Sequence, residues 1–325
     1  MSITTPALLE VRHALRKYLA DIAPNETILV GCSGGADSLA LTYALKQESE
    51  SKNFRLIPVV IDHDLQAGSA EIAAKVAKQL QSWGINEIFS AKAQVVMSDG
   101  LEASARRARY QIFSQALDTY SAKYFFLAHT QNDQAETVLL GLARGSGSKS
   151  LSGMSDVNGK FIRPLLEISR QTIEQLCEEI GLDFWIDPHN SDPKFTRVRV
   201  RKNILPLMEQ ELGPGIKAAL SRSAQLLRED NEALDRWSQQ EFATHQSQKS
   251  EGFEIDYLLG LPKAVRSRLL RLAIYALGTP SGTLSAEHLS PIEALITDWK
   301  GQGEISLPGG VKVSRISGRL SLSNP

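Results

Sequence analysis

The chain has 325 residues, of which 42% are hydrophobic and 22% charged, and its formal net charge is −1. This composition is typical of a soluble globular protein with room for one large domain and a smaller one. The balanced charge excludes a global basic field, so a nucleic-acid partner would have to be held by local basic patches.

The two cysteines, Cys32 and Cys177, form neither a CxxC pair nor part of a Cys/His cluster. A disulfide framework and a structural zinc site are therefore not expected. The first residues lack the basic start and apolar core of a signal peptide, and no apolar run reaches the ~18 residues that a membrane span needs. The sequence predicts a cytoplasmic protein with no membrane contact.

The first part of the chain alternates apolar runs with segments of helical spacing. A helix is expected over residues 6–20, and four strand-then-helix units follow it. The expected strands are 27–34, 54–64, 87–93 and 123–130, and the helices after them are 37–47, 69–84, 101–120 and 133–145. This order predicts an α/β fold with a mainly parallel, doubly wound sheet. Ligands of such sheets lie beyond the carboxyl ends of the strands, which directs attention to residues 33–38, 62–64 and 129–136.

The pattern changes after Gly145. A short strand and a helix are expected within residues 160–182, and a long helix from about residue 214 to 245. Further on, "EISLPGGVKV" alternates around a Pro-Gly-Gly turn and predicts a hairpin in a small α+β region over 250–325. We place the domain boundary at 213/214, with a catalytic domain over 1–213 and a smaller C-terminal region over 214–325.

The stretch "VGCSGGADS" (30–38) joins the first strand to the next helix. Its glycines leave backbone N–H groups open to an anion, and a helix N-terminus favours phosphate. The spacing is neither GxGxxG nor GxxxxGK[ST]. An aspartate beside phosphate requires a cation between them, so we expect Asp37 to bind Mg²⁺ that bridges a nucleotide's phosphates. The alternative is that Asp37 merely caps the helix.

"SGGADS" resembles the SGGxDS loop of the N-type ATP pyrophosphatases, the PP-loop superfamily. The resemblance implies that this loop holds the pyrophosphate end of ATP while a substrate oxygen attacks the α-phosphate, with ATP and Mg²⁺ as cofactors. In this superfamily the backbone after the second strand contacts adenine. The implied ATP-binding residues are Ser33, Gly34, Gly35, Ala36, Asp37, Ser38, Asp62, His63 and His129.

Four further blocks narrow the resemblance to the tRNA(Ile)-lysidine synthetases. They are "AHTQNDQAET" (128–137), the glycine-rich "ARGSGSKSLSGM" (143–154), "RPLL" (163–166) and "WIDPHNSDPKFTRVRVRKNILP" (185–206), where Val198 replaces the family's usual Asn. The resemblance implies that ATP adenylates the C2 oxygen of the wobble cytidine in tRNA(Ile) with a CAU anticodon. The ε-amine of L-lysine then displaces AMP. A homodimer is a further expectation.

Two other classes of function compete with this one. Another PP-loop adenylating enzyme would be a tRNA thiolase or a small-molecule amide ligase, but thiolases typically need reactive cysteines. Cys32 and Cys177 are expected to be small core residues instead. The other competitor is a nucleotide-binding module without catalysis, which would release no pyrophosphate.

Asp133 and Glu136 are three residues apart, so on a helix they share one face at the mouth of the fourth strand. The pair could bind the ammonium groups of free lysine. The alternative is a capping box, with Asp133 at the N-cap and Glu136 at N3. The resemblance favours lysine binding and places His129, at the end of the strand, near the nucleotide or the adenylated intermediate.

Basic residues form the last group of candidates. Arg109 matches a family segment and is expected to face ATP or the tRNA base. "RVRVRK" would project three arginines from one side if it were extended, as a tRNA contact or a transition-state clamp. A C-terminal basic set contacts tRNA phosphates or is an ordinary helix surface. We thus expect Asp37, Arg109, His129 and Arg201 to be catalytic, and the tRNA-binding residues to be Arg197, Arg199, Lys263, Arg266 and Arg268.

Overall fold

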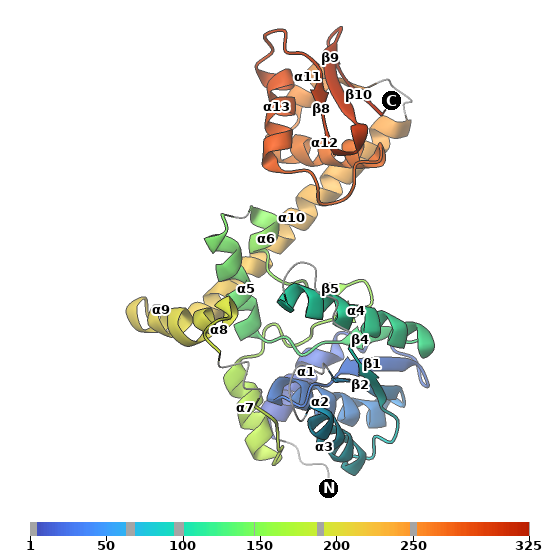
Figure 1. Ribbon diagram of the computed structural model, residues 1–325, viewed down its shortest axis with the longest axis vertical. Coiled ribbons are helices and arrows are strands. Elements are labelled where there is room, and N and C mark those ends of the chain that lie inside the picture. The colour runs from blue at the N-terminus through green and yellow to red at the C-terminus, as the bar shows by residue number, and fades with distance from the viewer. Residues whose placement is uncertain are drawn as a thin grey trace. The chain divides into compact units, whose positions relative to one another are not determined.

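The computed structural model describes residues 5–62, 69–93, 101–145, 147–186, 192–247 and 252–324 (Figure 1). The chain divides into two compact units, Met1–Leu227 and Arg228–Pro325. The division falls inside the helix α10 (Ile216–Ser247), which begins just after the predicted boundary at 213/214.

The first unit is built on a six-stranded sheet in the order β3-β2-β1-β4-β6-β5. Every neighbouring pair is parallel except β5 and β6, which are antiparallel. The predicted mainly parallel α/β fold is therefore confirmed. The strands are β1 (Thr27–Gly31), β2 (Arg55–Asp62), β3 (Phe89–Lys92), β4 (Tyr124–Phe126), β5 (Val157–Asn158) and β6 (Phe161–Ile162).

The central strands are apolar on both faces, because helices cover both sides of the sheet. Ile28 and Val30 of β1 pack into one core with α1, α2, α3 and α7, whereas Leu29 packs into a second core with α4. The alternation follows from the two-residue period of a strand. The helices of this unit are α1 (Pro6–Arg16), α2 (Ala36–Lys52), α3 (Ser69–Ser82), α4 (Leu101–Thr119), α5 (Gln131–Ala143), α6 (Ser148–Leu151), α7 (Arg170–Glu179), α8 (Thr196–Arg199), a π-helix (Val200–Ile204), α9 (Leu205–Glu211) and the first part of α10.

The strand order determines where a ligand can bind. From β1 the chain moves outward to β2 and β3, and then returns to pair β4 with the other side of β1. The carboxyl ends of β1 and β4 therefore flank the topological switch point, where open α/β sheets bind their ligands. Residues 33–38 and 129–136 follow these two strands, so two predicted site segments lie at this one point.

The second unit contains a four-stranded antiparallel sheet in the order β7-β10-β9-β8, packed against helices. The predicted hairpin is present, with a 3-10 turn at Pro308–Gly310 where Gly309 and Gly310 have positive φ. Beyond the end of α10, the elements are β7 (Phe253–Glu254), α11 (Ile255–Gly260), α12 (Lys263–Ala276), α13 (Ala286–Thr297), β8 (Ile305–Ser306), β9 (Lys312–Ile316) and β10 (Arg319–Ser323).

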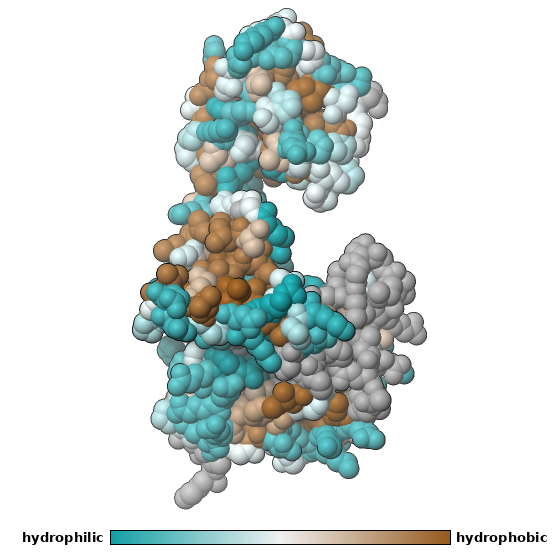
Figure 2. Space-filling view, turned by 60° about the vertical axis from the view of Figure 1, so that its left-hand side comes forward, coloured by the Kyte–Doolittle hydropathy of each residue, from teal (hydrophilic) through white to brown (hydrophobic). Residues whose placement is uncertain are grey.

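One face of the first unit carries apolar side chains that water can reach. Figure 2 shows brown, hydrophobic residues gathered in the region of α5, α9 and the start of α10. The large apolar side chains exposed on these helices, on the π-helix and at the C-cap of α9 are Leu142, Ile204, Leu207, Leu212 and Leu226. No helix among the described residues is long and apolar enough to cross a membrane.

Candidate active site

The glycine loop leaves β1 and enters α2 in a compact turn. Gly34 has a φ of +83°, and a Cβ at this position would meet Val76 Cγ2 at 2.5 Å, so only glycine fits without strain. Ser38 stabilises the turn: its hydroxyl accepts from the Ser33 N–H (3.1 Å) and donates to the Gly35 carbonyl (2.9 Å). The N–H of Trp185 donates to the Gly34 carbonyl (2.9 Å) and joins a distant segment to the loop.

Asp37 lies in the first turn of α2, where a carboxylate is favoured by the helix dipole. Its Oδ2 accepts from Arg170 Nη1 (2.5 Å), whereas Oδ1 is buried and has no hydrogen-bond partner among the described residues. Burial raises the pKa of Asp37 to about 6, although Arg170 acts in the opposite direction. Asp37 thus offers one free, buried oxygen where the loop enters α2.

Arg170 is the site residue that the sequence does not reveal. It begins α7, and its backbone N–H donates to Asn132 Oδ1 (3.3 Å) in the first turn of α5. Its Nε donates to Glu174 (2.9 Å), so the guanidinium is held from two sides. Arg170 therefore connects α2, α5 and α7, although it lies 133 residues from Asp37. The sequence signal around it, "ISRQTIEQ", indicates only the start of a helix.

The acidic pair occupies the start of α5. Asp133 accepts the N–H of Thr130 (2.9 Å) through Oδ2, so a capping box is present, but Thr130 is its N-cap and Asp133 its N3 residue. The predicted box with Asp133 at the N-cap is therefore wrong by one turn, and Glu136 takes no part in capping. The Glu136 side chain is only 1% exposed. Burial raises its pKa, although Arg201 opposes this effect.

Arg201 forms ion pairs with both members of this acidic pair. It donates to both oxygens of Glu136, from Nε (2.5 Å) and Nη2 (3.1 Å), and Nη2 also contacts Asp133 Oδ1 (3.2 Å). The pKa of Arg201 is raised: burial lowers it, but the contacts with Glu136, Asp133 and Asp37 outweigh that effect. The fork geometry of a guanidinium is suited to such a bidentate contact.

The segment around Arg201 is helical, so the predicted extended comb of three arginines is wrong. Residues 196–199 form α8 and residues 200–204 a π-helix, in which Val200 packs against Ala135 of α5 and Leu205 of α9. Arg199 instead folds back on its own turn and donates to the carbonyls of Pro193 (2.7 Å) and Lys194 (3.0 Å). Val198 has no polar function at the place where the related sequences usually have Asn.

His129 ends the segment after β4. Its Nδ1 is buried without a hydrogen-bond partner among the described residues. Burial lowers its pKa to about 4, and the charges of Arg163, Arg106 and Arg197 act in the same direction. Arg163 is itself buried and donates to Tyr110 Oη (3.2 Å). His129 is therefore neutral at physiological pH and is available as a hydrogen-bonding group.

The other residues of the first unit that the sequence predicts for the site lie on several different elements. Arg109 is exposed on α4. Asp62 ends β2, and its carbonyl accepts from the Ala93 N–H (2.8 Å). His63 lies outside the described residues. Arg197 is partly buried in α8, and its charge acts on both Glu136 and His129.

In the second unit, the basic residues predicted to bind tRNA differ in how exposed they are and in whether they already form ion pairs. Arg266 is buried, forms an ion pair with Glu293 and donates to the carbonyls of Leu258 (2.9 Å) and Leu261 (3.1 Å). It stabilises the unit, and its predicted contact with tRNA is not supported. Arg268 pairs with Asp235 (2.9 Å), and Lys263 is exposed at the start of α12.

The two cysteines are buried, as predicted. Burial raises the pKa of Cys177 to about 11 and also raises the pKa of Cys32. A buried thiol with a raised pKa is a poor nucleophile and a poor metal ligand. Neither cysteine therefore supports sulfur-transfer chemistry.

Comparison with known proteins decides the family. Residues 8–208 match the PP-loop domain, and residues 253–321 match the TilS substrate binding domain. The chain is 43% identical over 326 residues to the tRNA(Ile)-lysidine synthase of Thermobifida fusca, with 99% of each chain covered. It belongs to the tRNA(Ile)-lysidine synthase family.

Other relatives agree with this assignment. The tRNA(Ile)-lysidine synthase of Leifsonia xyli is 46% identical over 303 residues, which cover 92% of this chain and 90% of the relative. Among solved structures, the U34-tRNA thiolase NcsA of Methanococcus maripaludis, which carries a [4Fe-4S] cluster, aligns with a TM-score of 0.57 at 20% identity. The alignment covers 68% of this chain and 80% of that one. At that identity the likeness concerns the fold alone. The family members are ATP-dependent ligases, and the buried cysteines of this chain fit that class rather than a thiolase.

Proposed function

We propose that this enzyme ligates L-lysine to C2 of the wobble cytidine of tRNA(Ile) with a CAU anticodon, through an adenylated cytidine, and releases AMP and pyrophosphate. The observation that carries the proposal is the acidic pair Asp133 and Glu136, which Arg201 holds at the same switch point as the pyrophosphatase loop. A carboxylate pair recognises an amine, and the loop beside it binds a leaving pyrophosphate.

In the first step the cytidine O2 attacks the α-phosphorus of ATP, and the bond to pyrophosphate breaks. The backbone N–H groups at the N-terminus of α2 would stabilise the negative charge that moves onto pyrophosphate. Arg170 and Arg201, whose charges act on Asp37, add positive charge to the same region. We propose that Arg109 contacts ATP or the base, as the resemblance implies.

The site also fits Mg²⁺. Asp37 Oδ1 is buried and has no partner, and a carboxylate oxygen is the ligand type that Mg²⁺ prefers. In the described part of the chain, no group of three or more His, Cys, Asp or Glu side chains gathers around a metal position. Asp37 would thus hold the ion together with phosphate oxygens and water, and the ion would neutralise phosphate charge.

In the second step the ε-ammonium of lysine first loses a proton to give the neutral amine, which attacks C2. AMP leaves, and the attacking nitrogen loses a second proton to solvent. Glu136 and Asp133 would bind lysine through its ammonium groups, which requires Arg201 to share them with the substrate. Arg201 then has free N–H groups for the lysine carboxylate. His129 is neutral and hydrogen-bonds to the adenylated intermediate without adding charge.

The C-terminal region is proposed to contact tRNA. Residues 253–321 match a substrate binding domain, which supports the predicted division into a catalytic domain (1–213) and a C-terminal region (214–325). Lys263 is the basic side chain of the predicted set that is open to phosphate there, and Arg268 would have to leave its pair with Asp235. In the first unit we assign this role to Arg197 and Arg199.

A homodimer is proposed on the exposed apolar residues of α9 and α10 that Figure 2 shows. Exposed apolar patches on soluble proteins mark interaction sites. Light scattering should give twice the mass of the chain, and a Leu212→Glu/Leu226→Glu variant should give the mass of a monomer. An unchanged mass in this variant would place any interface elsewhere.

The central experiment combines labelled lysine and ATP with tRNA(Ile) transcripts that carry either a CAU or a GAU anticodon. Label should enter the CAU transcript alone, and pyrophosphate release should require ATP and that transcript together. Release without tRNA, or label in the GAU transcript, would contradict the proposal. A nucleotide-binding module without catalysis would give neither signal.

A further inference from the structure

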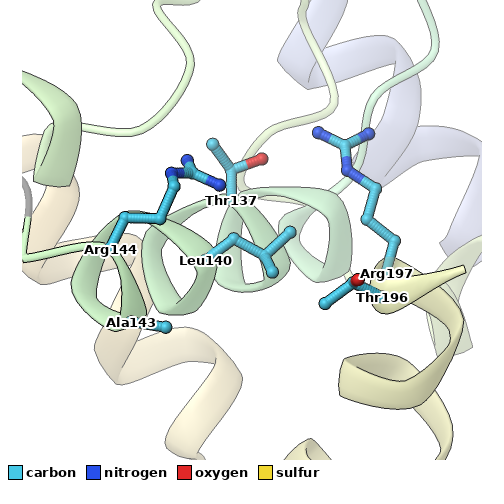
Figure 3. A pocket seen from close by; sticks show the side chains of 6 residues that line it. All are labelled: Thr137, Leu140, Ala143, Arg144, Thr196 and Arg197. Carbon is cyan, nitrogen blue, oxygen red and sulfur yellow. The ribbon is translucent and has the colours of Figure 1, made fainter. Parts of the chain in front are cut away.

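A cleft of about 520 Å³ opens between α5 and α8 in the first unit (Figure 3). It lies outside the set of residues assigned to ATP and lysine. One wall is formed by α5 and the other by the start of α8. The side chains that line it are Thr137, Leu140, Ala143, Arg144, Thr196 and Arg197.

The cleft continues the lysine site along one helix. Asp133, Thr137 and Leu140 share one face of α5, and Arg144, the C-cap residue of this helix, continues the same spacing of four, three and four residues. With a rise of ~1.5 Å per residue, Arg144 lies about 16 Å along the helix from Asp133. That separation suits a chemical group attached to the reacting base, not the reacting base itself.

The charge of the cleft indicates an anionic ligand. Its lining includes two arginines and no carboxylate. Within the described ranges, the guanidinium groups of Arg144 and Arg197 make neither a hydrogen bond nor an ion pair with other side chains or carbonyls. Figure 3 shows them on the two sides of the cleft, with Leu140 between them. Arg197 also acts electrostatically on Glu136 and His129, so this side of the cleft is near the acidic pair.

The remaining groups suit a nucleotide. Leu140 gives an apolar surface on which the flat face of a base can rest. The Thr137 hydroxyl donates to the Asp133 carbonyl (2.8 Å) and keeps its acceptor capacity. A ribose 2′-hydroxyl could donate to it, as in proteins that distinguish RNA from DNA. A guanidinium on each side binds phosphate or stacks on the base.

We propose that this cleft binds a nucleotide of the anticodon loop next to the wobble cytidine, with Arg144 on its phosphate and Leu140 under its base. The proposal rests on the function proposed above. It assigns Arg144, Thr137 and Leu140 to RNA binding, a role that neither the motifs nor the acidic pair predicts. The cleft would hold the RNA backbone in register while the cytidine reacts.

The test pairs a protein change with a change in the RNA. The full chain and its Arg144→Gln variant are titrated with CAU transcripts that carry one neutral methylphosphonate at each linkage around the cytidine. Arg144→Gln should weaken binding of the unmodified tRNA about 10-fold, because a charge-assisted contact is lost. The slope of log Kd against log salt should fall by about 0.7, the value for one single-stranded phosphate.

The decisive result is the coupling between the two changes. At one linkage beside the cytidine, the methylphosphonate should weaken wild-type binding and leave Arg144→Gln unaffected. Additive losses at every linkage, or an unchanged affinity in Arg144→Gln, would overturn the proposal. A single 2′-deoxy substitution at the same nucleotide should weaken wild-type binding and leave Thr137→Val unaffected; additive losses there would remove Thr137 from the site.

Controls separate this proposal from the function on which it rests. Arg55→Gln removes an arginine from the amino end of β2, at the opposite edge of the sheet, and should bind tRNA as the wild type does. A comparable loss of tRNA affinity in Arg55→Gln would mean that removing any arginine weakens binding, and this result would overturn the proposal that the cleft binds a specific nucleotide. If the wild type forms no lysidine on the CAU transcript, the proposed function fails. If the wild type is active and Arg144→Gln shows no coupling to a methylphosphonate at any linkage, the proposed role of the cleft is wrong while the proposed function stands.

Discussion

Replacing Arg201 by Gln should destabilise the first unit, because it leaves a buried carboxylate without its partner. The Glu136 side chain is 1% exposed and takes both of its charged contacts from Arg201. Removing one member of a buried ion pair costs about 3–5 kcal/mol. The Arg201 side chain is 40% exposed, so water can replace part of the lost contact, and we expect about 2–3 kcal/mol.

The loss should depend on pH in a defined direction. Burial raises the pKa of Glu136 in the folded chain above its ordinary value, and loss of Arg201 removes the main opposing effect. A carboxyl whose pKa is higher in the folded state binds more protons there, so stability falls as pH rises through the interval between the two pKa values. The free-energy deficit of Arg201→Gln should therefore be largest at about pH 8 and shrink toward about pH 5.

Urea unfolding measured by tryptophan fluorescence provides the assay. The chain has four tryptophans, and replacing Trp237 and Trp299 by Phe leaves only Trp83 and Trp185, which report on the first unit. The variants are then compared in this background at both pH values. The measured quantity is the free energy of unfolding extrapolated to water.

Two controls make the argument refutable. Glu136→Gln/Arg201→Gln removes both charges and should recover most of the stability at high pH. Arg55→Gln breaks an exposed pair with Glu87, in which the side chains are 50% and 44% exposed, and should cost less than about 1 kcal/mol. A deficit in Arg201→Gln that equals the Arg55→Gln deficit, or that does not change with pH, would refute the reasoning.

Three predictions concern activity. Asp37→Ala should abolish tRNA-dependent pyrophosphate release, and full release in this variant would exclude a metal role for Asp37. Pyrophosphate release by the wild type should rise as the pH passes about 6, where Asp37 ionises. Glu136→Ala should raise the KM for lysine about 10-fold or more with little change in the KM for ATP, and equal effects on both would favour a purely structural role. Arg170→Gln should raise the Mg²⁺ concentration needed for ATP binding, measured by calorimetry, because Asp37 loses the contact that orients it. Glu174→Gln keeps that contact and should behave as wild type. Similar shifts in both variants would contradict the role of Arg170.

Local patterns could predict much of this enzyme. Strands and helices of the first unit follow from the period of their apolar residues, and the glycine loop follows from the backbone freedom that its turn requires. The same patterns failed at "RVRVRK", which alternates like a strand but is helical. Val200 packs there against Ala135 of α5 and Leu205 of α9, and these tertiary contacts outweigh the preference of valine for strands.

The start of α5 was predicted from local sequence to within three residues. The sequence indicated a box at the start of α5, and a box is present, but it begins at Thr130 instead of Asp133. Because the helix begins three residues earlier, Asp133 takes the capping position N3, and Glu136 is buried and takes no part in the cap. Only the position of the helix start, which depends on where β4 ends, could settle this.

The sequence by itself determined the order of strands and helices, the anion-binding loop and the acidic pair, because each depends on neighbours within a few residues. The tertiary structure decided that β1 lies beside β4, which brings the loop and the pair to one edge of the sheet. It also decided that Arg170 contacts Asp37 across 133 residues, and that Arg201 contacts Glu136 across 65. Such contacts are set by packing around a common core, and burial makes each unpaired charge too costly to leave alone.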